Sequence, residues 1–125
     1  MSLTKILIIE NDQFLREFYQ ELLQAEGYLV DVAADGETGL KKIQENEYEL
    51  VLLDIKLPKK DGLQILHDLK IRPPVSDDVS IVVLANSGQE ATIKKCFDLG
   101  AAGFLIKSVL DAGQVLSEIR NFLPR

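Results

Sequence analysis

Short apolar runs alternate along the chain with longer stretches in which apolar residues recur every three or four positions. The apolar runs predict five β-strands, at residues 5–9, 29–33, 50–53, 80–84 and 103–106. Residues 29–33 alternate apolar and polar side chains, which is typical of an edge strand. Residues 50–53 are continuously apolar, as expected for a strand that is covered on both faces.

The stretches with helical periodicity predict five helices, one after each strand. Asp12 is expected to cap the first helix and Gly27 to end it. The apolar stripe of this helix is expected to consist of Phe14, Leu15, Phe18 and Leu22. A short second helix is predicted over residues 37–46, with Leu40 and Ile43 as its apolar positions.

The remaining three helices begin at recognisable capping sequences. The predicted capping residues are Asp61 with Gln64, Ser87 with Glu90, and Asp111. The helices that follow them are expected to cover residues 62–71, to end near Leu99, and to run from residue 112 towards the end of the chain.

The regular alternation of strand and helix predicts an α/β fold of the doubly wound (βα)5 type, a three-layer sandwich with helices on both faces of a parallel sheet. We expect the strand order 2-1-3-4-5. Residues 1–125 are expected to form a single domain, in which residues 1–3 could derive from a tag. In such sheets, ligands bind beyond the carboxyl ends of the strands.

Polar residues follow four of the predicted strands at this edge of the sheet. Glu10 and Asn11 follow the first strand, Asp54 the third, Asn86 the fourth and Lys107 the fifth. Each of them alone could be an ordinary polar residue at a strand end. Because the fold gathers the ends of the strands, their coincidence at one edge indicates a shared functional site.

The residue types at this edge suggest phosphoryl transfer. Carboxylates that lie close together repel one another, and a hard divalent cation such as Mg²⁺ would relieve that repulsion. A carboxylate beside a cation and a lysine can attack a phosphoryl group while the positive charges neutralise its oxygens. The product of that reaction would be an aspartyl phosphate.

Composition excludes several other classes of protein. The formal net charge of −6 argues against a nucleic-acid-binding surface. The single cysteine, Cys96, excludes an internal disulfide and a multi-cysteine metal site. No segment has the length or pattern of a membrane span or a signal peptide, so we expect a cytoplasmic protein that does not enter the membrane.

Some polar residues have simpler explanations than function. Asp12 is expected to be a helix cap, and His67 is expected to be an exposed residue without a metal partner. The lysine pairs at positions 41–42, 59–60 and 94–95 are expected to lie on solvated faces.

Four segments in order resemble the receiver domain of two-component response regulators, over essentially the whole chain. They are ILIIEND (6–12), VLLDIKLPKKDG (51–62), IVVLANSGQE (81–90) and LGAAGFLIKS (99–108). The resemblance implies a flavodoxin-like fold that serves as a signalling switch. It does not imply an enzyme, because the domain catalyses only its own phosphorylation and dephosphorylation.

The resemblance also implies roles for individual residues. Asp54 would accept a phosphoryl group from a phosphohistidine, and Lys107 would contact that group. Glu10, Asn11, Asp54 and the backbone carbonyl of Lys56 would hold Mg²⁺. Positions Ala85, Asn86 and Phe104 would belong to the switch, and Pro58 with Gly62 would shape the loop after Asp54.

Two positions depart from the family pattern. The second acidic residue of the metal site is Asn11, whose amide oxygen can bind a cation but brings no negative charge. The fourth strand ends in Ala85, where the family usually has a threonine or serine whose hydroxyl contacts the phosphoryl group. These departures indicate a receiver with altered activation, or one held in a single state.

The implied partners are a sensor histidine kinase or phosphotransfer protein and a downstream effector. The effector would bind the face formed by the fourth helix, the strand at residues 103–106 and the last helix, and the same face could pair two copies of the chain. The main alternative is a pseudo-receiver that binds partners without being phosphorylated. A flavin- or nucleotide-binding domain is disfavoured, because such sites need a loop of backbone N–H donors after the first strand, where this chain has Glu10 to Asp12.

Overall fold

The computed structural model describes residues 3–108 and 111–123, and part of the predicted tag-derived segment, residues 1–2, lies outside them. The described strands are β1 (Lys5–Ile9), β2 (Leu29–Ala33), β3 (Leu50–Asp54), β4 (Ser80–Ala85) and β5 (Gly103–Ile106). The helices are α1 (Gln13–Ala25), α2 (Gly36–Glu45), α3 (Gly62–Ile71), α4 (Glu90–Asp98) and α5 (Ala112–Arg120). Every predicted strand and helix is therefore present, within a few residues of its predicted bounds.

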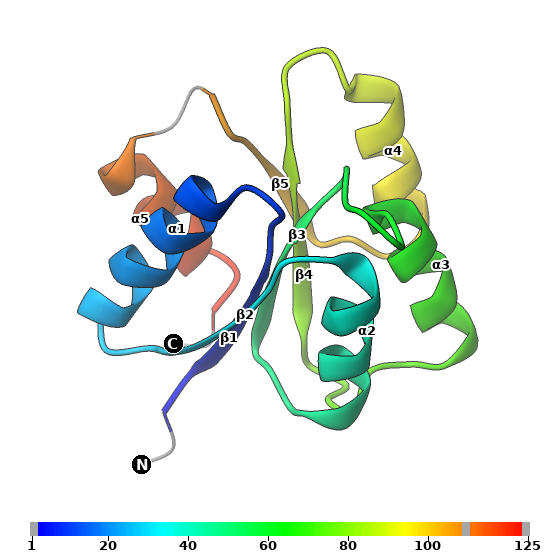
Figure 1. The fold of residues 1–125 in the computed structure, drawn as a ribbon, viewed down its shortest axis with the longest axis horizontal. Helices are drawn as coiled ribbons and strands as arrows, with labels where there is room; N and C mark the ends of the chain where they lie inside the picture. The colour runs from blue at the N-terminus through cyan, green and yellow to red at the C-terminus, as the bar shows by residue number, and fades with distance from the viewer. Residues whose placement is uncertain (1–2, 109–110, 124–125) are drawn as a thin grey trace.

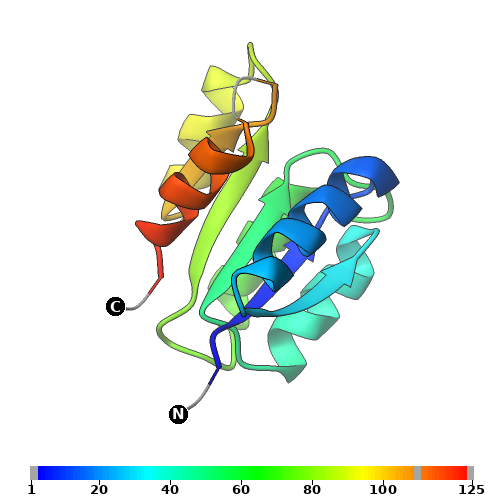
Figure 2. The same cartoon turned by 90° about the vertical axis from the view of Figure 1, so that its left-hand side faces the viewer.

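The strands form one parallel sheet in the order β2-β1-β3-β4-β5, as predicted. Helices α1 and α5 cover one face of the sheet, and α2, α3 and α4 cover the other (Figure 1). Turned by 90°, the molecule shows α1 and α5 in front of the strands (Figure 2). The result is the three-layer flavodoxin-like sandwich, in which the carboxyl ends of all strands meet at one edge.

Alternate residues of the central strands supply two separate hydrophobic cores. On the side of α1 and α5, Ile6 and Ile8 of β1 pack with Leu50 and Leu52 of β3. On the opposite side, Leu7 and Ile9 belong to a second cluster with residues of β3, β4 and the other three helices. These central strands are apolar throughout because both faces of the sheet are covered.

Aspartates cap most of the helices. Asp12, Asp61 and Asp111 each accept a hydrogen bond from a backbone N–H in the first turn of the following helix, as predicted, and Asp35 does the same for α2. Gly27 follows α1 with a positive φ of 91°, which confirms its role as a helix stop.

One predicted cap is wrong. Ser87 does not form a capping box with Glu90, because α4 begins later than expected: Gln89 occupies the N-cap position and makes no side-chain capping bond. Gln89 instead accepts a hydrogen bond from the backbone N–H of Asn86. Ser87 lies in the exposed turn between Asn86 and Gln89.

One predicted core position is also wrong. Phe14 was expected in the apolar stripe of α1, but its side chain is 78% exposed. Tyr19 and Leu23 are the fully buried residues of the helix, with Leu15, Phe18 and Leu22 partly buried beside them. Phe14 lies in the first turn of α1, to one side of the stripe that these residues form.

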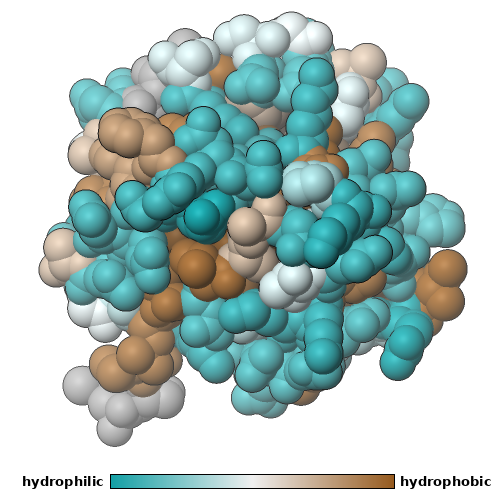
Figure 3. Space-filling view, in the orientation of Figure 1, coloured by the Kyte–Doolittle hydropathy of each residue, from teal (hydrophilic) through white to brown (hydrophobic). Residues whose placement is uncertain are grey.

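The face of the molecule seen in Figure 3 is mostly hydrophilic, and its hydrophobic residues form small separate patches. Within residues 3–108 and 111–123, no helix is both long and apolar enough to cross a membrane.

Candidate functional site

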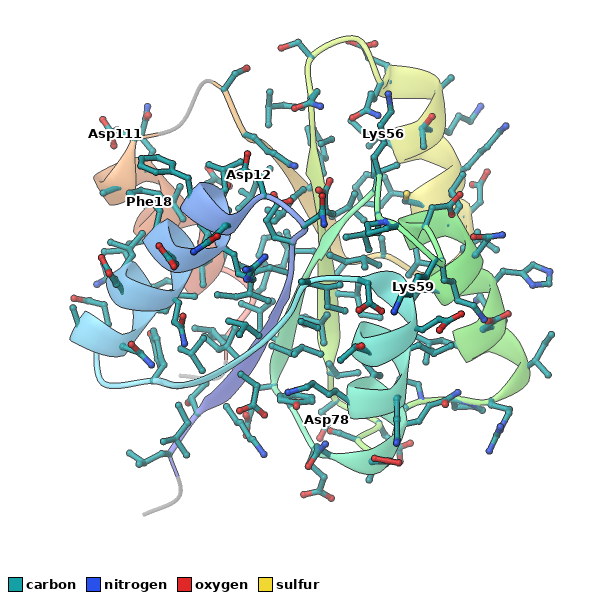
Figure 4. The ribbon with its side chains drawn as sticks, viewed as in Figure 1. Asp12, Phe18, Lys56, Lys59, Asp78 and Asp111 are labelled. Atoms are coloured by element: carbon teal, nitrogen blue, oxygen red, sulfur yellow. The ribbon has the colours of Figure 1, made fainter. Side chains whose placement is uncertain are left out.

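The loops that follow β1, β3, β4 and β5 enclose a cleft of about 470 Å³ at the carboxyl edge of the sheet. Its lining residues are Glu10, Asn11, Asp12, Leu15, Asp54, Lys56, Asn86, Lys107 and Ser108. Figure 4 shows Asp12 and Lys56 at this edge and Asp78, before β4, at the opposite edge. The topology therefore brings together the polar strand ends that the sequence singled out.

A lysine between two carboxylates forms the centre of the cleft. The ammonium nitrogen of Lys107 lies 2.8 Å from Glu10 Oε1 and 2.8 Å from Asp54 Oδ2. Glu10 is 1% exposed and Asp54 6% exposed. Lys107 directly follows β5, and its backbone N–H donates to the carbonyl of Ala85 at 2.9 Å. This bond ties the lysine to the end of the neighbouring strand.

Glu10 and Lys107 influence each other's pKa, and Asp54 influences both. Burial, and then the nearby Asp54 carboxylate, raise the pKa of Glu10 to about 7, although Lys107 acts in the opposite direction. Burial would lower the pKa of Lys107, but its two carboxylate partners outweigh that effect and raise it. Lys107 therefore stays charged, and when both carboxylates are ionised the trio carries one net negative charge.

The two carboxylate oxygens of Glu10 have different partners. Glu10 Oε2 accepts a hydrogen bond from the backbone N–H of Asp12 at 3.2 Å. Among residues 3–108 and 111–123, the buried Glu10 Oε1 has no hydrogen-bond partner apart from the Lys107 ammonium 2.8 Å away. A buried carboxylate oxygen in this state is suited to a cation.

Asn11 lies at the mouth of the cleft and is exposed. Its side-chain nitrogen donates a hydrogen bond to the backbone carbonyl of Ala34 at 3.2 Å, which links the loop after β1 to the loop after β2. An aspartate could not make this bond, because a carboxylate has no N–H. The amide at position 11 thus joins two loops as well as lining the cleft.

The loop after β3 keeps its backbone close to Asp54. Lys56 is exposed and lines the cleft. Gly62 donates its N–H to the carbonyl of Ile55 at 2.8 Å. A Cβ atom at Gly62 would lie 2.7 Å from the carbonyl oxygen of Asp54, so only glycine allows this approach. Pro58 also shapes the loop, since its carbonyl accepts from the N–H groups of Gly36 and Lys60.

The end of β4 offers little to a phosphoryl group. Ala85 is completely buried and has no polar side-chain atom. The side chain of Asn86 is exposed, and its backbone N–H donates to Gln89 Oε1 at 2.7 Å. The backbone N–H of Asn86 therefore already has a hydrogen-bond acceptor within the chain.

Phe104 lies on β5, outside the cleft, and is 43% exposed. Its ring meets that of Phe97 on α4 edge to face, with ring centroids 6.1 Å apart. The two aromatic rings join α4 to β5 on the surface of the molecule.

Two residues that the sequence did not single out contact the site. Arg16 donates hydrogen bonds from its guanidinium to the backbone carbonyls of Glu10 and Asn11. Gln89 accepts a hydrogen bond from the backbone N–H of Asn86. Neither carries a signal in the sequence beyond helical spacing. His67, by contrast, is exposed on α3 away from the cleft, as expected.

The chain matches the family model of the response regulator receiver domain over residues 6–120. Response regulator ArlR of Staphylococcus saprophyticus is 33% identical over 123 residues, which are 98% of this chain and 54% of that protein. Transcriptional regulatory protein DltR of Streptococcus agalactiae is 35% identical over 116 residues, 93% of this chain and 50% of that protein. The chain thus spans about half the length of these curated relatives.

Solved structures agree with the fold. A CheY-like response regulator receiver domain protein from Methanospirillum hungatei JF-1 has a TM-score of 0.85 and 27% identity, covering 96% of this chain and 93% of that one. The receiver domain of sensor histidine kinase PA1611 from Pseudomonas aeruginosa PAO1, described with a magnesium ion coordinated in its active site cleft, has a TM-score of 0.81 and 18% identity, covering 97% and 98%. At that identity the second likeness concerns the fold alone. With the match over residues 6–120, these findings show that the chain belongs to the family of response regulator receiver domains.

Proposed function

We propose that this receiver domain is a phosphorylation-dependent signalling switch in which Asp54 accepts the phosphoryl group. The observation that carries the proposal is the contact of Lys107 with both Asp54 and Glu10 at 2.8 Å, in a cleft open to solvent. A lysine held in this position can neutralise charge on a phosphoryl group that arrives at Asp54.

In the proposed reaction, a carboxylate oxygen of Asp54 forms a bond to phosphorus. The bond between phosphorus and the imidazole nitrogen of a phosphohistidine breaks, and its electron pair leaves with the imidazole. Lys107 contacts the Asp54 carboxylate before the reaction, and its ammonium would neutralise charge on the phosphoryl oxygens after it. The domain is then its own substrate, which is why we class it as a switch and not as an enzyme.

The residues of the cleft fit a magnesium ion. The buried Oε1 of Glu10, the carboxylate of Asp54, the amide oxygen of Asn11 and the backbone carbonyl of Lys56 would hold it. Bound Mg²⁺ would neutralise charge on the phosphoryl oxygens. The PA1611 receiver domain, which shares this fold, is described with a magnesium ion coordinated in its active site cleft.

The site carries fewer acidic ligands than a set of three carboxylates would give. Among residues 3–108 and 111–123, no group of three or more histidine, cysteine, aspartate or glutamate side chains could hold a metal ion. Asn11 stands where the third carboxylate would be, so we expect Mg²⁺ to bind more weakly than at a fully acidic site.

A second candidate function is a pseudo-receiver, a binding module that is not phosphorylated. The observation that favours it is the state of the β4 end, where Ala85 has no hydroxyl and the N–H of Asn86 is bonded to Gln89. Glu10, Asp54 and Lys107 oppose it, since a domain without phosphoryl chemistry has no need of this buried charged trio.

We propose a sensor histidine kinase or phosphotransfer protein as the phosphoryl donor and an effector as the downstream partner. The effector would bind the face formed by α4, β5 and α5, where Phe97 and Phe104 are both 43% exposed. A change in the rotamer of Phe104 would alter this face, and the same face could pair two copies of the chain.

The test is modification of the whole chain by a small phosphodonor in the presence of Mg²⁺, followed by intact mass spectrometry. We expect one phosphoryl adduct on the wild type and none on Asp54→Ala. Asp78→Ala is the control, because Asp78 is an exposed carboxylate at the opposite edge of the sheet. Equal modification of Asp54→Ala and wild type would refute the assignment of Asp54. Absence of any adduct on the wild type would favour the pseudo-receiver.

A further inference from the structure

Arg16, on the second turn of α1, holds the loop that carries Glu10 and Asn11. One nitrogen of its guanidinium, Nη1, lies 2.9 Å from the carbonyl oxygen of Glu10 and 3.1 Å from that of Asn11. Both carbonyls lie between the end of β1 and the start of α1, beyond the ladder of the sheet. Arg16 therefore supplies donors to two backbone groups that neither the strand nor the helix pairs.

The contact to Asn11 also orients the side chain of Glu10. The carbonyl of Asn11 and the N–H of Asp12 belong to the same planar trans peptide, so they point in opposite directions. Arg16 binds the carbonyl side of this peptide, and the N–H on its other side donates to Glu10 Oε2 at 3.2 Å. The chain of contacts runs from the guanidinium through one peptide plane to the buried carboxylate.

The orientation of Glu10 determines which of its oxygens faces the cleft. With Oε2 held by the N–H of Asp12, Oε1 is directed towards Lys107 and has no other hydrogen-bond partner in the described part of the chain. If the peptide between Asn11 and Asp12 turned over, its carbonyl would face the Glu10 carboxylate and repel it. The loop would then no longer present Glu10 and Asn11 in one fixed arrangement.

We propose that Arg16 is a positioning residue of the cation site: by binding the carbonyls of Glu10 and Asn11, it holds the loop after β1 in the arrangement that presents their oxygens to the cleft. Arg16 itself does not line the cleft. The inference rests on the proposed function, since it assigns Arg16 to the cation site of the switch. It adds a role that a surface arginine on an amphipathic helix would not have.

Arginine is suited to this role because its planar guanidinium presents donors in a fixed fork, whereas a lysine ammonium is a compact, strongly hydrated charge. Arg16 is half-buried, so part of its contacts are shielded from solvent. Replacement by methionine would keep much of the apolar stem while removing every donor.

The experiment compares wild type, Arg16→Met and Arg16→Lys in two measurements. The first is NMR in metal-free buffer, following the amide proton shift of Asp12 and its rate of exchange with water. The second is a titration with Mg²⁺ alone. We expect Arg16→Met to shift the Asp12 resonance upfield, to speed its exchange, and to weaken Mg²⁺ binding about tenfold or more, as for other groups that orient metal ligands. Arg16→Lys should retain part of the wild-type Asp12 signals and part of the wild-type Mg²⁺ affinity.

Arg72→Met is the matched control, because Arg72 is exposed at the end of α3, at the opposite edge of the sheet. It should leave both measurements unchanged. Arg16→Met with wild-type Asp12 signals and wild-type Mg²⁺ affinity would overturn the proposal. So would an equal loss in Arg72→Met, since that would point to a general effect of charge. If Arg16→Met does not fold, the same two measurements on Arg16→Lys decide, and wild-type values in both would overturn the proposal.

The NMR measurement uses neither metal nor phosphodonor, so it is independent of the proposed phosphorylation. If the wild type takes no phosphoryl group while Arg16→Met still loses the Asp12 signature and Mg²⁺ affinity, the switch function fails but the role of Arg16 stands. If the wild type is phosphorylated on Asp54 and Arg16→Met behaves as wild type, only the role of Arg16 fails.

Discussion

The side-chain oxygen of Gln89 accepts a hydrogen bond from the backbone N–H of Asn86 at 2.7 Å. Asn86 follows β4 and lines the cleft, and Gln89 is the residue directly before α4. A phosphoryl group on Asp54 that needs this N–H would have to displace Gln89. The start of α4 is thereby connected to the occupancy of the cleft, at the strand end where Ala85 offers no hydroxyl.

Replacement of Gln89 by alanine should release the N–H of Asn86 for the phosphoryl group. A hydrogen bond to a charged group contributes roughly 1.5–3 kcal/mol, so binding of the phosphate mimic beryllofluoride should tighten severalfold once no side chain competes. The measurement is a beryllofluoride titration followed by amide chemical shifts. Gln89→Glu keeps an acceptor on this N–H and should bind no more tightly than wild type. Identical affinities in wild type and Gln89→Ala would show that Gln89 does not compete.

A hydroxyl at position 85 should strengthen the response of the domain to the same mimic. Ala85 is completely buried, so serine, the smaller hydroxyl residue, is the substitution of choice. The added hydrogen bond would favour the active arrangement by about tenfold in population. Hydrogen exchange across residues 85–107, including Phe104, measures the response. A wild-type response already as large as that of Ala85→Ser would mean that another group replaces the hydroxyl.

The substitution Asn11→Asp should have opposite effects on metal binding and on stability. A third carboxylate adds negative charge to the site, so Mg²⁺ affinity measured by titration should rise. The bond from the amide of Asn11 to the carbonyl of Ala34 is lost, so the free energy of unfolding in metal-free buffer should fall by about 1 kcal/mol.

Asn46→Asp is the matched control for Asn11→Asp. The amide of Asn46 donates to the carbonyl of Lys42 at 3.1 Å, a bond of the same type at the end of α2. This variant should be destabilised similarly without any change in Mg²⁺ affinity. Equal or weaker Mg²⁺ binding by Asn11→Asp would contradict the view that the missing charge limits the site.

The raised pKa of Glu10 predicts a specific dependence of stability on pH in metal-free buffer. The pKa of Glu10 is about 7 in the folded chain, against 4.5 for an ordinary glutamate. Between these values the folded chain retains the proton that the unfolded chain releases, so the free energy of unfolding falls as pH rises through this window. Above about pH 7 this contribution is fully lost and the curve becomes flat.

Glu10→Gln should remove this slope, because glutamine does not titrate. Chemical denaturation between about pH 5 and about pH 8 measures it. Glu45→Gln, a substitution at an exposed glutamate of α2, should retain the wild-type slope. A wild-type slope in Glu10→Gln would show that another group is responsible.

Local patterns in the sequence were sufficient for the elements of this fold. Apolar runs such as residues 50–53 mark the strands, since a strand covered on both faces must be apolar throughout. Asp61 and Asp111 mark helix starts, because the unpaired N–H groups of a first turn need a nearby acceptor. The order of these elements also restricts the topology, and with it the edge where Glu10, Asp54 and Lys107 meet.

Only the tertiary structure decided which contacts form between groups that local spacing does not relate. Phe14 was expected in one apolar stripe with Leu15 and Phe18, yet it stays exposed. Ser87 and Glu90 have the spacing of a capping box, but Gln89 takes the N-cap position and pairs with Asn86.

The sequence by itself determined which chemical groups reach the cleft, because strand ends and charges can be read from local pattern. Their arrangement was decided by folding. Lys107 lies between two carboxylates that are 97 and 53 residues away along the chain, and both ion pairs exist only once β1, β3 and β5 share a sheet. The role of the amide of Asn11 likewise depends on Ala34, which the loop after β2 brings to it. Such contacts depend on the packing of distant segments, which no local pattern encodes.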